Sequence, residues 1–297
     1  MKALLALLLL AANGSAVAAL NVFASTPEWG ALAKELGGEQ VKVYTATTAL
    51  QDPHRIEARP SLIARARSAD LVVCSGAELE SGWLPLVQTQ SGNSKIQVGQ
   101  PGYFEAASVS KIIDRPALLD RSLGDIHASG NPHLHLHPGN VAQVASALAE
   151  RMATLDPPNA RAYRERAKAF LERWQEAVTR WEKRASPLKG LPVVVHHKDL
   201  SYLLSWLGMQ EVGSLEPKPG LPPTTAHLAE LLERLRQNPP KAVLRSAYSD
   251  PKPAEWLAQR AKIPAVVLPY TVGGSENAKD LFGLYEDTIA KLLAALK

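Results

Sequence analysis

Short apolar runs alternate with helical patterns along most of the chain, and the same scheme occurs twice. In the first half the runs that favour β-strands cover residues 21–24, 41–44, 71–74 and 96–98. In the second half they cover residues 193–196, 212–215, 242–244 and 265–268. Helical patterns intervene at residues 61–66, 199–207, 224–237, 254–261 and 278–296. Several apolar runs lack strict alternation, which is typical of parallel strands buried on both faces.

A long helical pattern separates the two halves. Between residues 157 and 185, apolar side chains recur at spacings of three and four: Tyr163, Ala167, Phe170, Trp174, Val178, Trp181 and Ala185. This periodicity predicts one amphipathic helix, roughly 43 Å long, with a solvated polar face. We therefore expect an α/β fold of two Rossmann-like lobes with mostly parallel sheets, joined by a long backbone helix. The first lobe would cover residues 20–155, the linking helix 156–187 and the second lobe 188–297.

The N-terminal residues have the parts of a secretory signal peptide. Met1 and Lys2 precede an almost unbroken apolar stretch over residues 3–12, and small residues follow up to Ala19. The stretch is shorter than the ~20 residues needed to span a bilayer. We expect cleavage near residue 19 and export to the periplasm. No cysteine lies near that junction, so we expect no lipid anchor there.

Size, charge and cysteine content narrow the class of protein. The chain beyond residue 19 exceeds the ~250 residues at which single cores usually stop growing, which favours two domains. Cys74 is the only cysteine, lies in an apolar run and cannot form an internal disulfide, so we interpret it as a buried apolar residue. The net charge of +4 is spread along the chain, and we expect neither nucleic-acid binding nor a membrane-binding patch.

The placement of the histidines suggests chemistry. The chain has eight: His54, His127, His133, His135, His137, His196, His197 and His227. Ligand sites of parallel α/β sheets form beyond the carboxyl ends of the strands. His54 follows the second predicted strand and His197 follows the first strand of the second half. Because neutral imidazole is the commonest transition-metal ligand, a metal site is a natural hypothesis.

Local geometry leaves alternatives for several of these histidines. An extended chain would project His133, His135 and His137 to one side, although packing or helix capping would also explain the last two. Alternation along a strand lets only one of His196 and His197 face a given site. His127 could deliver metal transiently or could be a solvated loop residue.

At this point the chain resembles a known family, the metal-specific solute-binding proteins of ABC importers for zinc and manganese. The resemblance covers nearly the whole mature chain and rests on three motifs. These are Asp52-Pro53-His54 with Glu57 and Pro60-Ser61, then Asn131-Pro132-His133 with Pro138, and finally His197 with Tyr202. It implies two α/β lobes bridged by a long helix, with metal in the cleft between them. It also implies a monomeric, non-enzymatic protein that meets a membrane permease and, in some settings, a periplasmic metallochaperone.

The resemblance implies His54, His133 and His197 as metal ligands and a carboxylate as the fourth. That carboxylate commonly follows the last strand of the second lobe, but the usual Thr-Asp-Ser form is missing here. We predict Asp280, with Glu276 as the alternative, while Asp280 could instead simply favour the positive N-terminus of the last helix. The long histidine-rich loop that many zinc-binding members carry before the second motif is also missing, so any auxiliary capture of metal would be modest.

The predicted cargo is Zn²⁺. Three nitrogens and one carboxylate suit tetrahedral Zn²⁺, and His197 stands where manganese-importing relatives usually carry a carboxylate. One alternative is a binding protein for Mn²⁺. Another is a zinc-dependent hydrolase, although the chain has no His-Glu-x-x-His helix and Glu57 is the nearest candidate base. A third is a cleft protein for an organic ligand such as a chelate or haem, lined by Trp83, Tyr103, Phe104 and Arg245.

Overall fold

Two four-stranded parallel sheets form the framework of the protein. The computed structural model describes residues 19–116 and 127–295, so the predicted signal peptide lies outside the described residues except for Ala19. The first sheet contains β1 (Leu20–Ala24), β2 (Val41–Thr45), β3 (Leu71–Cys74) and β4 (Tyr103–Glu105), in the order β2-β1-β3-β4. The second contains β5 (Pro192–Val195), β6 (Gln210–Ser214), β7 (Ala242–Ser246) and β8 (Ala265–Leu268), in the order β6-β5-β7-β8. The repeated scheme and the parallel pairing predicted from the sequence are confirmed.

One predicted strand is wrong. Residues 96–98 do not join the sheet: Ile96 is buried at the end of a short 3-10 helix, and Val98 is 72% exposed. The fourth strand lies further on, at Tyr103–Glu105, and pairs with β3. The chain enters the sheet through Gly102, where a Cβ atom would lie 2.5 Å from the carbonyl oxygen of Lys95. This close backbone approach requires glycine and sets where pairing begins.

Helices lie at every predicted pattern, to within a few residues at each end, and also at residues 27–37, 84–91 and 138–155, for which no range was predicted. They are α1 (Pro27–Gly37), α2 (Pro60–Arg67), α3 (Leu84–Ser91), α4 (Pro138–Leu155), α5 (Ala160–Ala185), α6 (Ser201–Leu207), α7 (Thr225–Arg234), α8 (Pro251–Ala261) and α9 (Leu281–Ala295). Several begin at a proline, whose fixed φ suits the first turn and whose missing N–H has no partner to lose there. None of the helices in the described ranges is long and apolar enough to cross a bilayer.

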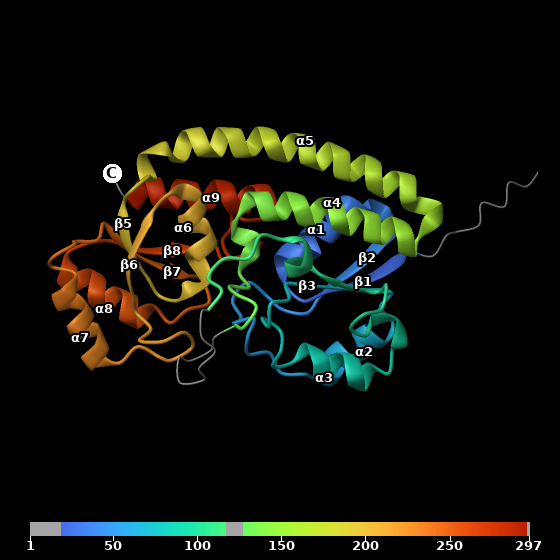
Figure 1. The fold of residues 1–297 in the computed structure, drawn as a ribbon, viewed down its shortest axis with the longest axis horizontal. Coiled ribbons are helices and arrows are strands. Elements are labelled where there is room, and N and C mark those ends of the chain that lie inside the picture. The colour runs from blue at the N-terminus through green and yellow to red at the C-terminus, as the bar shows by residue number, and fades with distance from the viewer. Residues whose placement is uncertain (1–18, 117–126, 296–297) are drawn as a thin grey trace, which may run out of the picture.

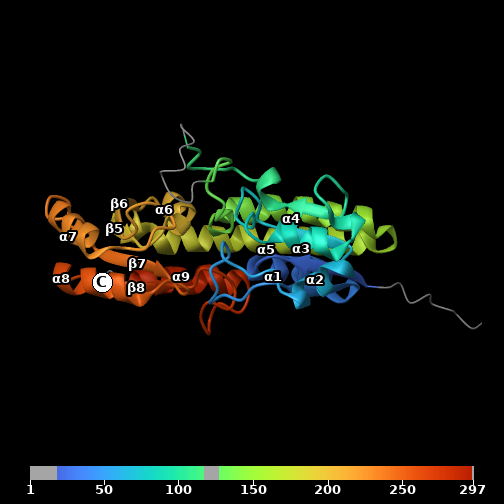
Figure 2. The same ribbon diagram turned by 90° about the horizontal axis from the view of Figure 1, so that it is seen from below.

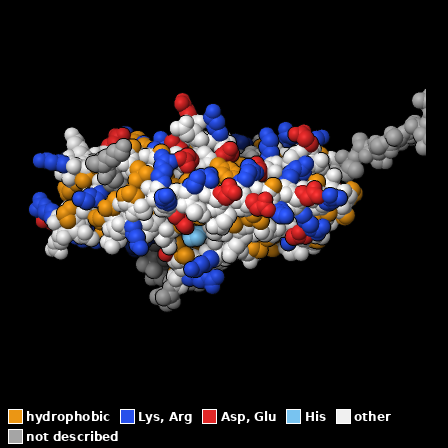
Figure 3. Space-filling view, turned by 90° about the horizontal axis from the view of Figure 1, so that it is seen from above, with side chains coloured by type: hydrophobic (Ala, Val, Ile, Leu, Met, Phe, Trp, Pro, Cys, Tyr) orange, Lys and Arg blue, Asp and Glu red, His pale blue; other side chains and the backbone are white. Residues whose placement is uncertain are grey.

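Helix α5 runs along one side of both sheets. Figure 1 shows α5 above α4 and α9, and Figure 2 shows the same helix from below. Its buried stripe contains the predicted residues, except that Ala177 is buried and Val178 only partly so. The outer face carries interspersed basic and acidic side chains (Figure 3), and Arg164 pairs with Glu150 of α4 at 2.7 Å. The prediction of a solvated polar face is therefore confirmed.

One large apolar cluster extends from Leu20 to Leu292 and includes residues of both sheets and of α1, α4, α5, α6 and α9. Two smaller clusters cover the opposite faces, one beneath α2 and α3 and the other beneath α7 and α8. Because residues of both sheets belong to this cluster, the two sheets share one core. The candidate site described next is built between the carboxyl ends of the two sheets.

Candidate metal centre

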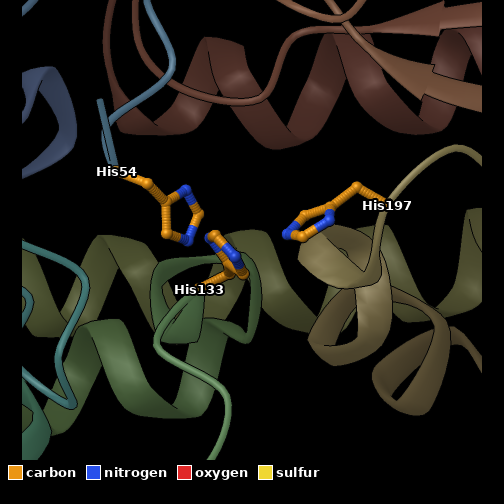
Figure 4. Close-up of side chains that lie close together, drawn as sticks. All are labelled: His54, His133 and His197. Atoms are coloured by element: carbon orange, nitrogen blue, oxygen red, sulfur yellow. The ribbon is translucent and has the colours of Figure 1, made fainter. Parts of the chain in front are cut away.

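Three histidines from distant parts of the chain converge. His54, His133 and His197 each offer a ring nitrogen, and these atoms all lie within 4.8 Å of one another. The ring centroids are 5.1 Å apart for His54 and His133, 5.5 Å for His133 and His197, and 5.7 Å for His54 and His197. Figure 4 shows the three imidazoles pointing toward a common centre. Within the described ranges this is the group of metal-ligating side chains that the fold brings together.

His54 is held by the loop that follows β2. The carboxylate oxygen Oδ1 of Asp52 accepts from the backbone N–H of His54 at 3.0 Å and lies 2.8 Å from ring Nδ1. The indole of Trp83 donates to the carbonyl of Pro53 at 3.0 Å, which pins the loop to the buried core. Burial raises the pKa of Asp52, but the hydrogen bonds and charge of His54 more than offset this and leave the pKa below its ordinary value. The ionised carboxylate then fixes the proton on Nδ1 and leaves Nε2 free to ligate.

His133 is almost fully buried and lies just before a short 3-10 helix, Leu134–Leu136. Its Nδ1 is 2.7 Å from the phenol oxygen of Tyr270, and its backbone N–H donates to the Oδ1 of Asn131. Burial, followed by the charges of His54 and the other histidines nearby, holds the pKa of His133 well below its usual range. Burial also raises the pKa of Tyr270, so the phenol stays neutral. A neutral imidazole is the form that a metal requires.

Asn131 ties the two halves together beside this ring. Its side-chain amide donates to the carbonyl oxygen of Lys198 at 2.8 Å, and its own carbonyl accepts from the hydroxyl of Tyr202 at 2.8 Å. Both partners belong to the segment after β5. The Asn-Pro-His motif and the aromatic residue after His197 therefore meet in space.

His197 follows β5 and is anchored by a carboxylate from another loop. Its Nδ1 lies 2.7 Å from Oε2 of Glu216, which also accepts from the backbone N–H of Gly220 at 2.8 Å. Burial lowers the pKa of His197, but the hydrogen bond to Glu216 and the charge of Asp199 outweigh it, and the net pKa is raised. His196 does not belong to the group, which confirms that alternation sends only one of the pair to the site.

The predicted fourth ligand is not brought into this group. Asp280 is exposed, and its Oδ1 accepts from the backbone N–H of Gly283 at 2.7 Å in the first turn of α9. Glu276 is exposed as well. The helix-end role that the sequence left open for Asp280 matches this contact.

The remaining histidines have other partners. His137 accepts from the backbone N–H of Gly139 at 3.1 Å and caps α4, as one of the sequence alternatives predicts. His135 is fully buried, with Nε2 2.8 Å from the carbonyl oxygen of Tyr270. His227 lies with its Nε2 3.0 Å from the carbonyl oxygen of Ser214.

Sequence reasoning missed three side chains that bear on the site. Tyr270 and Glu216 hold ligand rings but stand 137 and 19 residues from them, and neither has a local pattern that would reveal it. His127, considered only as a delivery or solvated residue, has its Nε2 3.2 Å from Nε2 of His54. Glu57, the nearest base in the sequence, is exposed.

Comparisons with known proteins agree with this architecture. The family model described as zinc-uptake complex component A, periplasmic (ZnuA), matches residues 22–296. The manganese ABC transporter substrate-binding lipoprotein PsaA of Streptococcus mitis is 21% identical over 263 residues, which cover 88% of this chain and 83% of that protein. The high-affinity zinc uptake system protein ZnuA of Yersinia pestis is 25% identical over 265 residues, with 85% and 83% covered.

Solved structures show the same fold. A crystal structure of ZnuA superimposes with a TM-score of 0.75 at 20% identity and covers 94% of this chain and 100% of that chain. The Mn-bound periplasmic metal-binding protein from Candidatus Liberibacter asiaticus gives a TM-score of 0.75 at 17% identity, with the same coverage. The chain thus belongs to the ZnuA family of solute-binding proteins, as a non-enzymatic, extracytoplasmic metal-binding component of an ABC importer.

Proposed function

We propose that the protein captures Zn²⁺ in the periplasm and delivers it, as a monomer, to the membrane permease of the importer. The observation that carries this proposal is the composition of the cluster. Its three members are all imidazoles, and among the described residues no carboxylate joins them. Imidazole nitrogen suits Zn²⁺, whereas Mn²⁺ favours more oxygen ligands and a larger coordination number.

The orientation of the rings supports high affinity. Each ring has its Nδ1 against an oxygen of Asp52, Tyr270 or Glu216, which leaves Nε2 for the metal. Such partners fix the tautomer and the direction of the ring before the metal arrives, so less conformational freedom is lost on binding. The carboxylates of Asp52 and Glu216 also place negative charge behind two ligands and offset part of the charge of the cation.

The origin of the ligands suggests how the metal is held and released. His54 and His133 belong to the first half of the chain, and His197 follows the first strand of the second half. A metal bound by all three links the two halves. An increase in the distance between the halves at the permease would remove a ligand and weaken binding.

Competition titration of the metal-stripped protein tests the choice of metal, since relatives named for manganese and for zinc both match this chain. Zinc and manganese affinities would be measured against chromophoric chelators at neutral pH. We expect zinc to bind at least about a hundredfold more tightly, about 2.7 kcal/mol. Equal affinities, or tighter manganese binding, would contradict the assignment of zinc.

A growth experiment tests the cargo in the cell, because tight binding alone does not identify what is imported. A strain that lacks the protein should grow poorly under zinc starvation and recover when zinc is added. Rescue by manganese but not by zinc would overturn the proposed function.

A further inference from the structure

We propose that His127 supplies the fourth ligand, so that the metal is held by four imidazole nitrogens. This inference rests on the proposed function of the same site and replaces the carboxylate predicted at Asp280. It also narrows the cargo to a cation that accepts a tetrahedral shell of nitrogen ligands.

The distance between His127 and His54 is the first support. Their Nε2 atoms lie 3.2 Å apart and their ring centroids 5.3 Å apart. Two nitrogens bound to one tetrahedral Zn²⁺ at 2.0–2.1 Å would lie about 3.3 Å apart. The observed separation therefore already matches one edge of a zinc tetrahedron. Without metal, the same two atoms can share a proton in a hydrogen bond.

The position of His127 relative to the other ligands is the second support. His127, His133 and His197 line one cavity of about 260 Å³, together with Asn131. His54 is in ring contact with His127, His133 and His197 alike. His127 therefore stands at the edge of the cluster beside His54, outside the set of ring nitrogens that all lie within 4.8 Å of one another, and ligation would bring its ring inward.

The turn that carries His127 is built into the fold. The backbone N–H of Gly130 donates to the carbonyl of His127 at 3.0 Å. Gly130 has a φ of +105°, and a Cβ atom there would lie 2.7 Å from the carbonyl oxygen of Ile113. Ser129, inside the turn, is bound through its N–H and hydroxyl to the carboxylate of Glu78 at 3.2 and 2.8 Å. These contacts hold the turn next to the cluster.

Asp280 has a contact that competes with ligation. Its Oδ1 accepts from the N–H of Gly283 and completes the first turn of α9. The exposed position of Asp280 contrasts with the partly buried position of His127. An all-imidazole shell is also neutral, and the charge of the cation would then be offset by Asp52 and Glu216 behind the rings.

Two variants and one matched control test the proposal in the full mature chain. His127→Ala removes the proposed ligand. Asp280→Asn removes the carboxylate charge but keeps an acceptor for the turn of α9. His137→Ala removes a histidine that caps α4 outside the cluster and serves as the control. Zinc affinity would be measured by competition titration, and the number of imidazole ligands by X-ray absorption of the zinc-loaded protein.

We expect four imidazoles in the parent protein, and three imidazoles with one oxygen ligand in His127→Ala. The affinity of His127→Ala should fall at least about tenfold, since even partners that only orient a ligand cost that much. Asp280→Asn and His137→Ala should remain within about threefold of the parent. A parent spectrum with three imidazoles, or loss of affinity in Asp280→Asn but not in His127→Ala, would overturn the proposal.

The outcomes also separate this inference from the proposed function. If His133→Ala weakens zinc binding and His127→Ala does not, the three-histidine site is supported and the assignment of His127 as the fourth ligand is wrong. If His133→Ala binds zinc as the parent does, the site itself is wrong and the inference falls with it.

Discussion

The phenol of Tyr270 offers the sharpest test of how this site is organised. Replacing it in Tyr270→Phe removes the oxygen that lies 2.7 Å from Nδ1 of His133. The aromatic ring remains to pack against His133 and His135, at centroid distances of 5.6 and 4.8 Å. The backbone carbonyl that His135 contacts is unchanged by the substitution. The variant therefore removes one hydrogen bond and little else.

The structure sets the expected magnitude. His133 is 1% exposed, so water cannot readily replace the lost acceptor, and an unsatisfied buried N–H costs about 1–3 kcal/mol. Removing a group that orients a metal-bound histidine typically weakens metal binding about 10- to 100-fold, or about 1.4–2.7 kcal/mol. Part of the cost also falls on the metal-free protein, in which the same contact is lost. We therefore expect a loss of zinc affinity near the lower end of that range, so that the variant binds zinc about tenfold more weakly than the parent.

The assay is competition titration of metal-stripped parent and variant against a zinc-binding dye at pH 7.5. Tyr248→Phe is the matched control, because its ring lies 5.2 Å from that of Tyr270 while its hydroxyl contacts Asp199 at 2.8 Å rather than a ligand. We expect the control to stay within about threefold of the parent. Denaturant unfolding of both metal-free variants checks that the fold is intact.

A Tyr270→Phe protein that is folded and binds zinc as tightly as the parent would refute the reasoning. It would mean that the phenol does not orient His133 in the metal-bound state. Equal losses in Tyr270→Phe and Tyr248→Phe would also contradict it, because they would point to a general effect on the core.

Each of the substitutions His54→Ala, His133→Ala and His197→Ala should lower zinc affinity by orders of magnitude in the same titration. Losses under about threefold in all three variants would contradict the assignment of the site. Zinc affinity should fall as pH drops below about 6.5. Because the pKa of His197 is raised, protons compete with the metal for its ring as pH falls. In the metal-free protein, the pair of protonated His197 and Glu216 stabilises the fold at low pH, and this stabilisation is lost as pH rises through the raised pKa of His197. Titrations from pH 7.5 to 5 would show this, and a flat profile would contradict it. Gly102→Ala should destabilise the fold by about 1–3 kcal/mol in denaturant unfolding, because its Cβ would lie 2.5 and 2.6 Å from two carbonyl oxygens.

Much of the fold could be predicted because burial leaves a local pattern. The stripe from Tyr163 to Ala185 recurs with the helical period and becomes α5, since one face of a helix must cover the core. The apolar run of β3 is buried at every position and could be recognised without its neighbours. The apolar run at residues 96–98 was wrongly predicted as a strand, because a local apolar pattern does not show which strand the run can pair with. Here β3 pairs with Tyr103–Glu105 instead.

The three histidines that cluster in the structure could be singled out from the sequence, because the three motifs that carry the family resemblance each contain one of them. The sequence could not determine most of what surrounds them. The phenol that meets His133 comes from 137 residues further along the chain, and His127 meets His54 across 73 residues. Such contacts depend on how two sheets and their loops are placed by one shared core, which no local pattern encodes. The sequence therefore shows the residue types that can bind a metal and, in Asp52, one neighbour that orients a ring, whereas Tyr270 and Glu216 are brought to the other two rings only by the tertiary structure.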